Sequence, residues 1–92
     1  MYLMSLFINT QDKDKFIRNG FEYSISNINN KKYNRLKYIE LDDGFDYIRL
    51  SAEWENGEET APLIIESYNA TYVTIPNIII NLISEGLLRK DE

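Results

Sequence analysis

The chain has 92 residues, a mass of 10.9 kDa and a formal net charge of −5, and 43% of its residues are hydrophobic. This length and composition predict one globular domain over residues 1–92, since the chain is too short for two cores and too apolar for disorder. Neither cysteine nor histidine occurs, which excludes disulfides, thiolate zinc sites, cysteine nucleophiles and the usual general base. We therefore expect a non-enzymatic domain that holds no metal and no cofactor.

The N-terminal segment and the amino-acid composition suggest a cellular location and a type of source genome. The apolar run from Met1 to Ile8 has no basic segment before it and is too short for a signal peptide or a membrane span. We therefore expect a cytoplasmic protein with no membrane partner. Isoleucine (13 residues), asparagine (10), tyrosine (7) and lysine (6) have AT-rich codons and are abundant, which suggests a low-GC bacterium, its phage or an archaeal virus.

The N-terminal part predicts a strand followed by a short helix. Tyr2 to Ile8 is a nearly continuous apolar run, which is typical of a buried strand. Asn9 or Thr10 is a suitable cap for a helix that ends near Asn19, with Gly20 just beyond. The expected core contacts of this helix are Phe16 and Ile17.

The next segment alternates in a way that predicts another strand. From Phe21 to Ser26, apolar and polar residues take turns, which places the apolar side chains on one side of a strand. The stretch from Asn27 to Asn34 is polar and basic, and we expect it to form a loop.

The middle of the chain predicts antiparallel strands joined by tight turns. The strands are expected at Leu36–Leu41 and Phe45–Glu55, separated by Asp42-Asp43-Gly44, and a further strand follows Asn56-Gly57. Asp-Gly and Asn-Gly supply the positive φ angles that hairpins need. In the central strand one set of alternate residues is apolar and predicts the buried side: Ile48, Leu50, Ala52 and Trp54. We expect Trp54 to be buried beside Ile48, Leu50 and the C-terminal helix. Pro62 predicts an edge, a bulge or a later start for the next strand, and Glu66 to Asn69 is expected to turn before a strand from Ala70 to Ile75.

The C-terminal part predicts an amphipathic helix that begins at Pro76. Its apolar stripe comprises Ile78, Ile79, Leu82, Ile83 and Leu87. Gly86 either stops this helix or weakens its interior, and Ile80 lies off the stripe, where it is available for a homodimer contact. The predicted fold is a single α+β domain. It has an antiparallel sheet of four to six strands, with a short N-terminal helix and the C-terminal helix packed on one face.

Charge is segregated along the sequence. Residues 11–37 carry a net charge of +4, whereas residues 38–66 carry −8. The acids at the predicted turns and on the wet strand face, with one tyrosine beside them, form a candidate partner-binding set: Asp42, Asp43, Asp46, Tyr47, Glu53, Glu55, Glu58 and Glu59. Such a set favours a protein partner with a basic surface, as for a phage or viral inhibitor that imitates nucleic acid. The alternative is a solvated face that keeps the protein soluble.

A second functional hypothesis is nucleic-acid binding. Basic and aromatic residues interleave near the middle of the chain, as they do in proteins that bind single strands: Lys31, Lys32, Tyr33, Arg35 and Lys37. The net charge of −5 opposes long-range attraction to a polyanion, so this hypothesis ranks second. A cation site at Asp42, Asp43 and Asp46 is disfavoured because the spacing of an EF-hand is absent.

Overall fold

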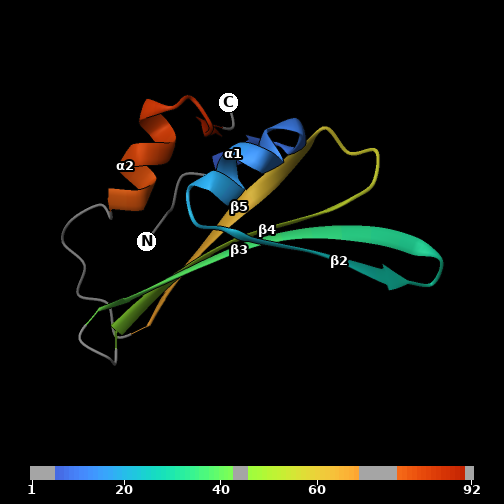
Figure 1. Ribbon diagram of the computed structural model, residues 1–92, viewed down its shortest axis with the longest axis horizontal. Coiled ribbons are helices and arrows are strands. Elements are labelled where there is room, and N and C mark those ends of the chain that lie inside the picture. Colours follow the sequence, from blue (N-terminus) through green and yellow to red (C-terminus); the bar gives the residue numbers. More distant parts are fainter. Residues whose placement is uncertain (1–5, 43–45, 69–76, 91–92) are drawn as a thin grey trace.

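The computed structural model describes residues 6–42, 46–68 and 77–90 of the chain. It confirms the α+β class: a six-stranded antiparallel sheet carries both helices on one side (Figure 1). The elements in chain order are β1 (Leu6–Asn9), a 3-10 turn (Thr10–Asp12), α1 (Lys13–Arg18), β2 (Glu22–Ile28), β3 (Lys31–Asp42), β4 (Asp46–Glu55), β5 (Thr60–Tyr68), α2 (Asn77–Ser84) and β6 (Arg89–Lys90). Neither helix of the described residues is long and apolar enough to cross a bilayer.

Strand β5 joins the two halves of the sheet, whose order is β2-β3-β4-β5-β1-β6. Residues 60–63 of β5 pair with β1, and residues 64–68 pair with β4. Pro62 lies in the half that pairs with β1, opposite Phe7, and outside the ladder to β4. A proline has no N–H to donate. Because Pro62 is not paired with β4, the ladder between β4 and β5 loses no hydrogen bond there. Strand β5 continues to Tyr68, so the turn expected to begin at Glu66 lies inside a strand.

Both helices end at a glycine with positive φ. Gly20 has φ 100°, and the N–H of Phe21 donates to the carbonyl of Phe16 at 3.1 Å, as in a Schellman motif. The rings of Phe16 and Phe21 then meet edge to face, with centroids 5.2 Å apart. Helix α2 ends in the same way at Gly86, whose φ is 73°. The predicted end of the first helix is confirmed, and Gly86 is the stop of the second.

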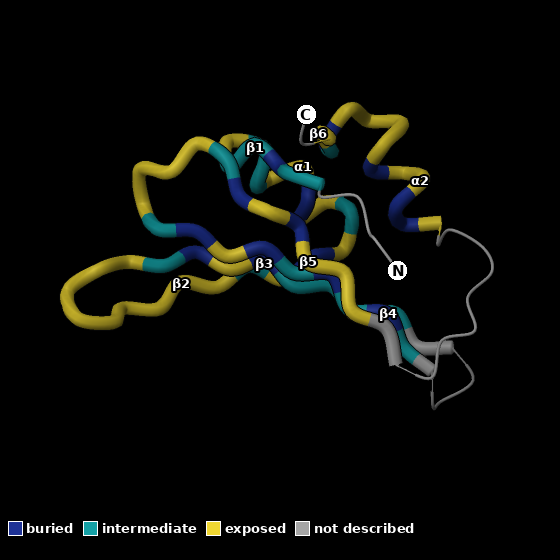
Figure 2. Tube along the Cα trace, turned by 180° about the vertical axis from the view of Figure 1, so that it is seen from behind, coloured by how far each residue is buried: buried dark blue, intermediate teal, exposed yellow. Residues whose placement is uncertain are grey.

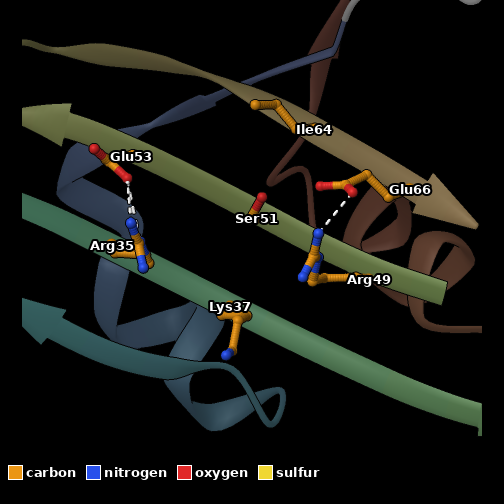
Figure 3. Close-up of a pocket in the computed structure, with 7 residues that line it drawn as sticks. All are labelled: Arg35, Lys37, Arg49, Ser51, Glu53, Ile64 and Glu66. Carbon is orange, nitrogen blue, oxygen red and sulfur yellow. Dashed lines mark hydrogen bonds and ion pairs between the residues drawn. The ribbon is translucent and has the colours of Figure 1, made fainter. Parts of the chain in front are cut away.

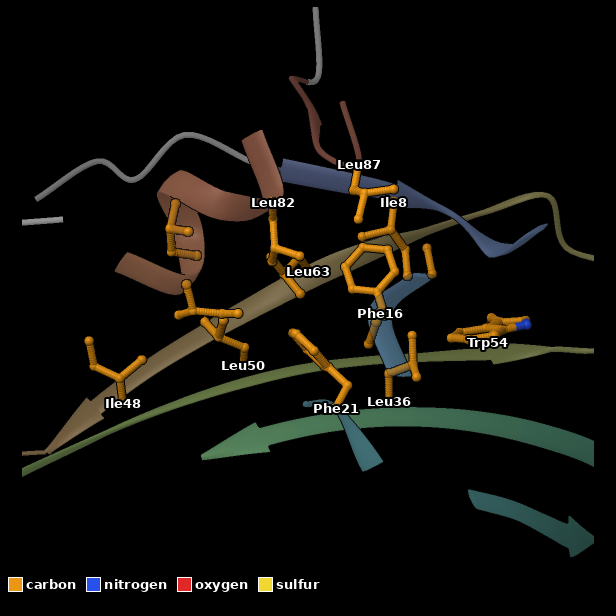
Figure 4. Packing of buried hydrophobic residues seen from close by; sticks show 14 residues of the cluster. Ile8, Phe16, Phe21, Leu36, Ile48, Leu50, Trp54, Leu63, Leu82 and Leu87 are labelled. Atoms are coloured by element: carbon orange, nitrogen blue, oxygen red, sulfur yellow. The ribbon is translucent and has the colours of Figure 1, made fainter. Parts of the chain in front are cut away.

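The core lies between the sheet and the two helices (Figures 2 and 4). The predicted buried stripe of β4 is confirmed, as is the burial of Phe16. Ile17 and Ile83, which were expected to be core residues, are exposed instead, because each points away from the sheet side of its helix. The buried hydrophobic residues are Ile8, Phe16, Phe21, Leu36, Ile48, Leu50, Ala52, Trp54, Ala61, Leu63, Ile78, Ile79, Leu82 and Leu87.

The expected loop from Asn27 to Asn34 is wrong: this stretch forms the tip of a hairpin. Strand β2 runs to Ile28 and β3 begins at Lys31, so only Asn29 and Asn30 form the turn. Their φ angles are 53° and 66°, and two positive φ angles are the mark of a type I′ turn. Asparagine tolerates this left-handed region better than other residues with a Cβ, which explains how a turn forms without glycine.

The connection between β4 and β5 is longer than a two-residue turn. It comprises residues 56–59, and Gly57 has φ 99°. The N–H of Glu58 donates to the carbonyl of Glu55 at 3.1 Å, within the loop. The N–H of Thr10, which follows β1, donates to the carbonyl of Glu59 at 2.9 Å and connects the loop to the N-terminal part of the chain. Asp42, the first residue of the predicted Asp42-Asp43-Gly44 turn, is the last residue of β3, and the other two lie outside the described residues. The strand predicted at residues 70–75 and the helix start at Pro76 also lie outside them.

Candidate binding face

The side of strands β2 to β5 that faces away from the helices is left uncovered by the described elements, and we call it the open face (Figure 1). Alternation along each strand and the pairing register decide which side chains belong to it. They are Glu22, Ser24, Ser26, Ile28, Lys31, Tyr33, Arg35, Lys37, Ile39, Tyr47, Arg49, Ser51, Glu53, Glu55, Ile64 and Glu66.

Strand pairing cancels the charge segregation of the sequence on this face. The basic residues of β3 lie beside the acidic residues of β4: Arg35 is opposite Glu53, and Lys31 forms an ion pair with Glu55. The open face carries four cations and four carboxylates: Lys31, Arg35, Lys37, Arg49, Glu22, Glu53, Glu55 and Glu66. Its net charge is therefore zero, although the two sequence segments that supply it differ strongly in charge.

Three of the four cations form ion pairs with carboxylates of a neighbouring strand. Arg35 donates from Nε and Nη2 to one oxygen of Glu53, at 3.1 and 2.9 Å. The other two pairs are Lys31–Glu55, at 3.7 Å, and Arg49–Glu66, at 2.6 Å. The hydrogen bond that Arg49 donates to Glu66, together with the charge of that carboxylate, raises the pKa of Arg49 above its ordinary value. Because these pairs are solvent-exposed, they contribute little to folding and more to the charge pattern that a partner meets.

A shallow hollow of about 310 Å³ lies in the middle of the open face (Figure 3). Arg35 with Glu53 forms one end and Arg49 with Glu66 the other, while Lys37, Ser51 and Ile64 line the remainder. Lys37 has no ion pair among the described residues, so its ammonium group is available to an incoming acceptor. The hollow therefore combines one unpaired cation with two fixed ion pairs.

Three residues of the candidate partner-binding set lie on the open face. Glu53 is exposed, while Tyr47 and Glu55 are half-buried. Glu58 and Glu59 are exposed in the loop between β4 and β5. The backbones of Asp42 and Asp46 pair with each other, but their side chains, and all of Asp43, lie outside the described residues.

Glu58 has a structural contact that its turn position alone did not reveal. Its carboxylate accepts a hydrogen bond from the backbone N–H of Glu55 at 3.0 Å, and its own carbonyl accepts one from the hydroxyl of Thr10 at 2.7 Å. This side chain holds the end of β4 in place. A substitution at Glu58 would therefore change the loop as well as the surface charge.

Four of the five residues proposed for nucleic-acid binding share the open face. Lys31, Tyr33, Arg35 and Lys37 are alternate residues of β3, so they point the same way. Lys32 points to the other side of the sheet. The carboxylates of β4 lie beside two of the cations in this row, which a phosphate backbone would have to displace.

Sequence reasoning left Arg49, Ser51 and Glu66 out of the candidate sites, and likewise Ile39 and Ile64. The signal that finds them is strand alternation continued through β3 and β5, together with a register that puts the centres of three strands side by side. Alternation was visible in the sequence. The register of β3, β4 and β5 is a property of the pairing between strands, and the alternation within one strand does not contain it.

The described residues contain no group of three or more potential metal ligands, and the side chains of Asp42, Asp43 and Asp46 lie outside them. Comparisons with protein-family models, curated proteins and solved structures gave no match to this chain.

Proposed function

We propose that this chain is a non-enzymatic protein-binding domain and that the open face is its contact surface. The observation that carries the proposal is an uncovered four-strand surface on which ion pairs, an unpaired lysine and half-exposed isoleucines lie together. Protein interfaces combine such apolar and polar contacts, and tyrosine and arginine are enriched in them. The open face supplies both residue types.

The charge pattern favours a partner that is itself a protein. The open face is neutral, whereas the whole chain carries −5, so the excess acid belongs to residues outside the open face. A net charge attracts a partner of opposite sign over long range, and the neutral open face then accommodates apolar contacts. This supports a partner with a basic surface, for example one whose nucleic-acid-binding surface is occluded by this domain.

The two carboxylates in the hollow support recognition better than catalysis. Glu53 and Glu66 line the hollow, and a pair of acids in a concave site is the arrangement that hydrolysis by carboxylates needs. Each of them, however, accepts hydrogen bonds from an arginine and is about half exposed to solvent. A general acid requires a carboxyl group that is kept protonated by a desolvated environment. The arginines instead complete two fixed ion pairs.

The proposal is tested with two double variants of the same chemistry on two surfaces. Ile39→Ser with Ile64→Ser removes apolar area from the open face, and Ile80→Ser with Ile83→Ser removes it from the outside of α2. The side chains are matched in exposure, at 49% and 52% on the sheet and 50% and 55% on the helix. Each variant and the wild type are used to capture partners from an extract of the native host, and affinity for the captured protein is then measured directly.

We expect the open-face variant to lose at least about tenfold in affinity, because half-exposed isoleucines become buried in a contact. The helix variant should bind as the wild type does. Equal binding by both variants, or a loss confined to the helix variant, would contradict the proposal. A loss confined to the helix variant would mean that the contact surface lies on α2.

A second candidate function, single-strand nucleic-acid binding, is favoured by the row of Lys31, Tyr33, Arg35 and Lys37 on one strand face. Cations that follow a backbone, with an aromatic ring between them, are the usual elements of such a surface. A gel-shift assay with single-stranded oligonucleotides at low and moderate salt separates the two functions. If the wild type retards the oligonucleotide at low salt and Lys37→Glu does not, the result supports nucleic-acid binding. If the wild type retards no oligonucleotide, the result contradicts this candidate and favours protein binding.

A further inference from the structure

We propose that the outer edge of β2 is a self-association site, where β2 pairs antiparallel with β2 of a second copy of this chain. The inference is independent of the partner proposed above. It follows from an open strand edge, from the backbone groups which that edge presents, and from a sequence that is complementary to itself.

The two edges of the sheet differ in how they are protected. Strand β6 forms one edge with only Arg89 and Lys90, and short edges that carry basic side chains resist pairing with other chains. Strand β2 forms the other edge with seven residues, of which Glu22 is the only charged one and none is proline. Figure 2 shows this strand exposed along almost its whole length. Among the described residues, the β2 edge therefore lacks the features that prevent edge-to-edge pairing.

The hairpin turn determines which backbone groups of β2 point outward. In a two-residue hairpin the residues that flank the turn exchange hydrogen bonds, here Ile28 and Lys31. Alternate residues of β2 from Ile28 backwards then bond to β3. The N–H and C=O groups of Tyr23, Ile25 and Asn27 are directed away from β3, where the described structure offers them no strand.

These three residues define a self-complementary register centred on Ile25. With Ile25 opposite Ile25 of the second copy, Tyr23 lies opposite Asn27 and Glu22 lies opposite Ile28. All seven residues of β2 are paired in this register, and registers displaced along the strand pair fewer. The outward groups of one copy then meet the outward groups of the other, as an antiparallel ladder requires.

Side-chain chemistry favours the same arrangement. Ile25 and Ile28 are 54% and 53% exposed in a single copy, and both lie within the paired segment of the dimer. An antiparallel pair also brings the acidic end of β2, at Glu22, toward the basic turn of the second copy, where Lys31 begins β3. A second copy of this chain is therefore the partner that best matches the β2 edge. The pairing would join the two open faces into one continuous surface.

The absence of cysteine allows a direct test by disulfide trapping. In the proposed register the Cα atoms of the two Ile25 residues lie about 5.5 Å apart, which is within the range that a disulfide bridges. Ile25→Cys should therefore form a covalent dimer under mild oxidation. Ser24→Cys is the matched control, because Ser24 lies opposite Ser26 and the two Ser24 Cα atoms are about 7–8 Å apart diagonally. Mixing Ser24→Cys with Ser26→Cys should restore the cross-link.

Sedimentation of the unmodified chain from about 1 to 200 µM supplies the reversible counterpart. We expect a dimer at the upper end, its loss in Ile25→Lys, where two ammonium groups would meet at the centre, and its retention in Ile80→Lys on α2. Near-UV circular dichroism confirms that each variant is folded. A wild-type monomer throughout this range, or equal trapping by Ile25→Cys and Ser24→Cys, would overturn the proposal. So would a dimer that Ile80→Lys dissolves and Ile25→Lys leaves intact.

Discussion

Asn34 is the one polar side chain that is buried among the described residues, with 6% of its surface exposed. Its amide oxygen accepts a hydrogen bond from the hydroxyl of Tyr23, and its nitrogen donates to the side chain of Asn56 at 2.7 Å and to the carbonyl of Trp54 at 3.5 Å. One side chain thus connects β2, β3 and the end of β4. A buried amide is tolerated where its donors and acceptor are satisfied, as they are here.

We expect Asn34→Ala to lower the free energy of unfolding by about 1–3 kcal/mol, because the Tyr23 hydroxyl would lose its acceptor in a half-buried place. Tyr23→Phe is the control that removes the hydroxyl instead. The double variant should cost less than the sum of the two single variants, since each breaks the same bond. Urea denaturation measures all three, and additive losses would show that the two side chains do not interact.

At the scale of elements, the sequence predicted strands and helix ends well where a local device specifies them. Gly20 ended the first helix, and alternation in β4 identified its buried side. The β2–β3 hairpin was missed because Asn29-Asn30 resembles any polar loop until both φ angles are known. Trp54 was expected beside the C-terminal helix. It is buried, but Figure 4 shows it at the other end of the cluster from Ile48, because a strand advances about 3.3 Å per residue.

The loop between β4 and β5 offers a test at this scale. Gly57 has φ 99°, and a Cβ at this position would meet nothing within 4 Å, so a substitution there reports backbone conformation alone. Gly57→Val should lower the free energy of unfolding by about 1 kcal/mol or more. Gly57→Asn should cost less, because asparagine tolerates positive φ. Thermal denaturation compares the two, and a neutral valine would mean that the loop is free to adopt another conformation.

At the scale of the whole molecule, the open face could be predicted only in part. Sequence alone placed Tyr47, Glu53 and Glu55 on a wet strand face, and their positions are as expected. It also separated a basic from an acidic segment, and the fold then laid these segments side by side. That neutralisation depends on register, which is a long-range property that composition and local periodicity do not contain.

The most direct test of the open face exchanges a charge pair without removing it. Arg35→Glu with Glu53→Arg keeps an opposite-charge pair across β3 and β4 but reverses its direction. Because exposed pairs contribute little to folding, the double variant should unfold at a temperature close to that of the wild type. Its affinity for the partner captured by the wild type should fall by at least about tenfold, with slower association. A folded double variant that binds with unchanged affinity and association rate would contradict the account.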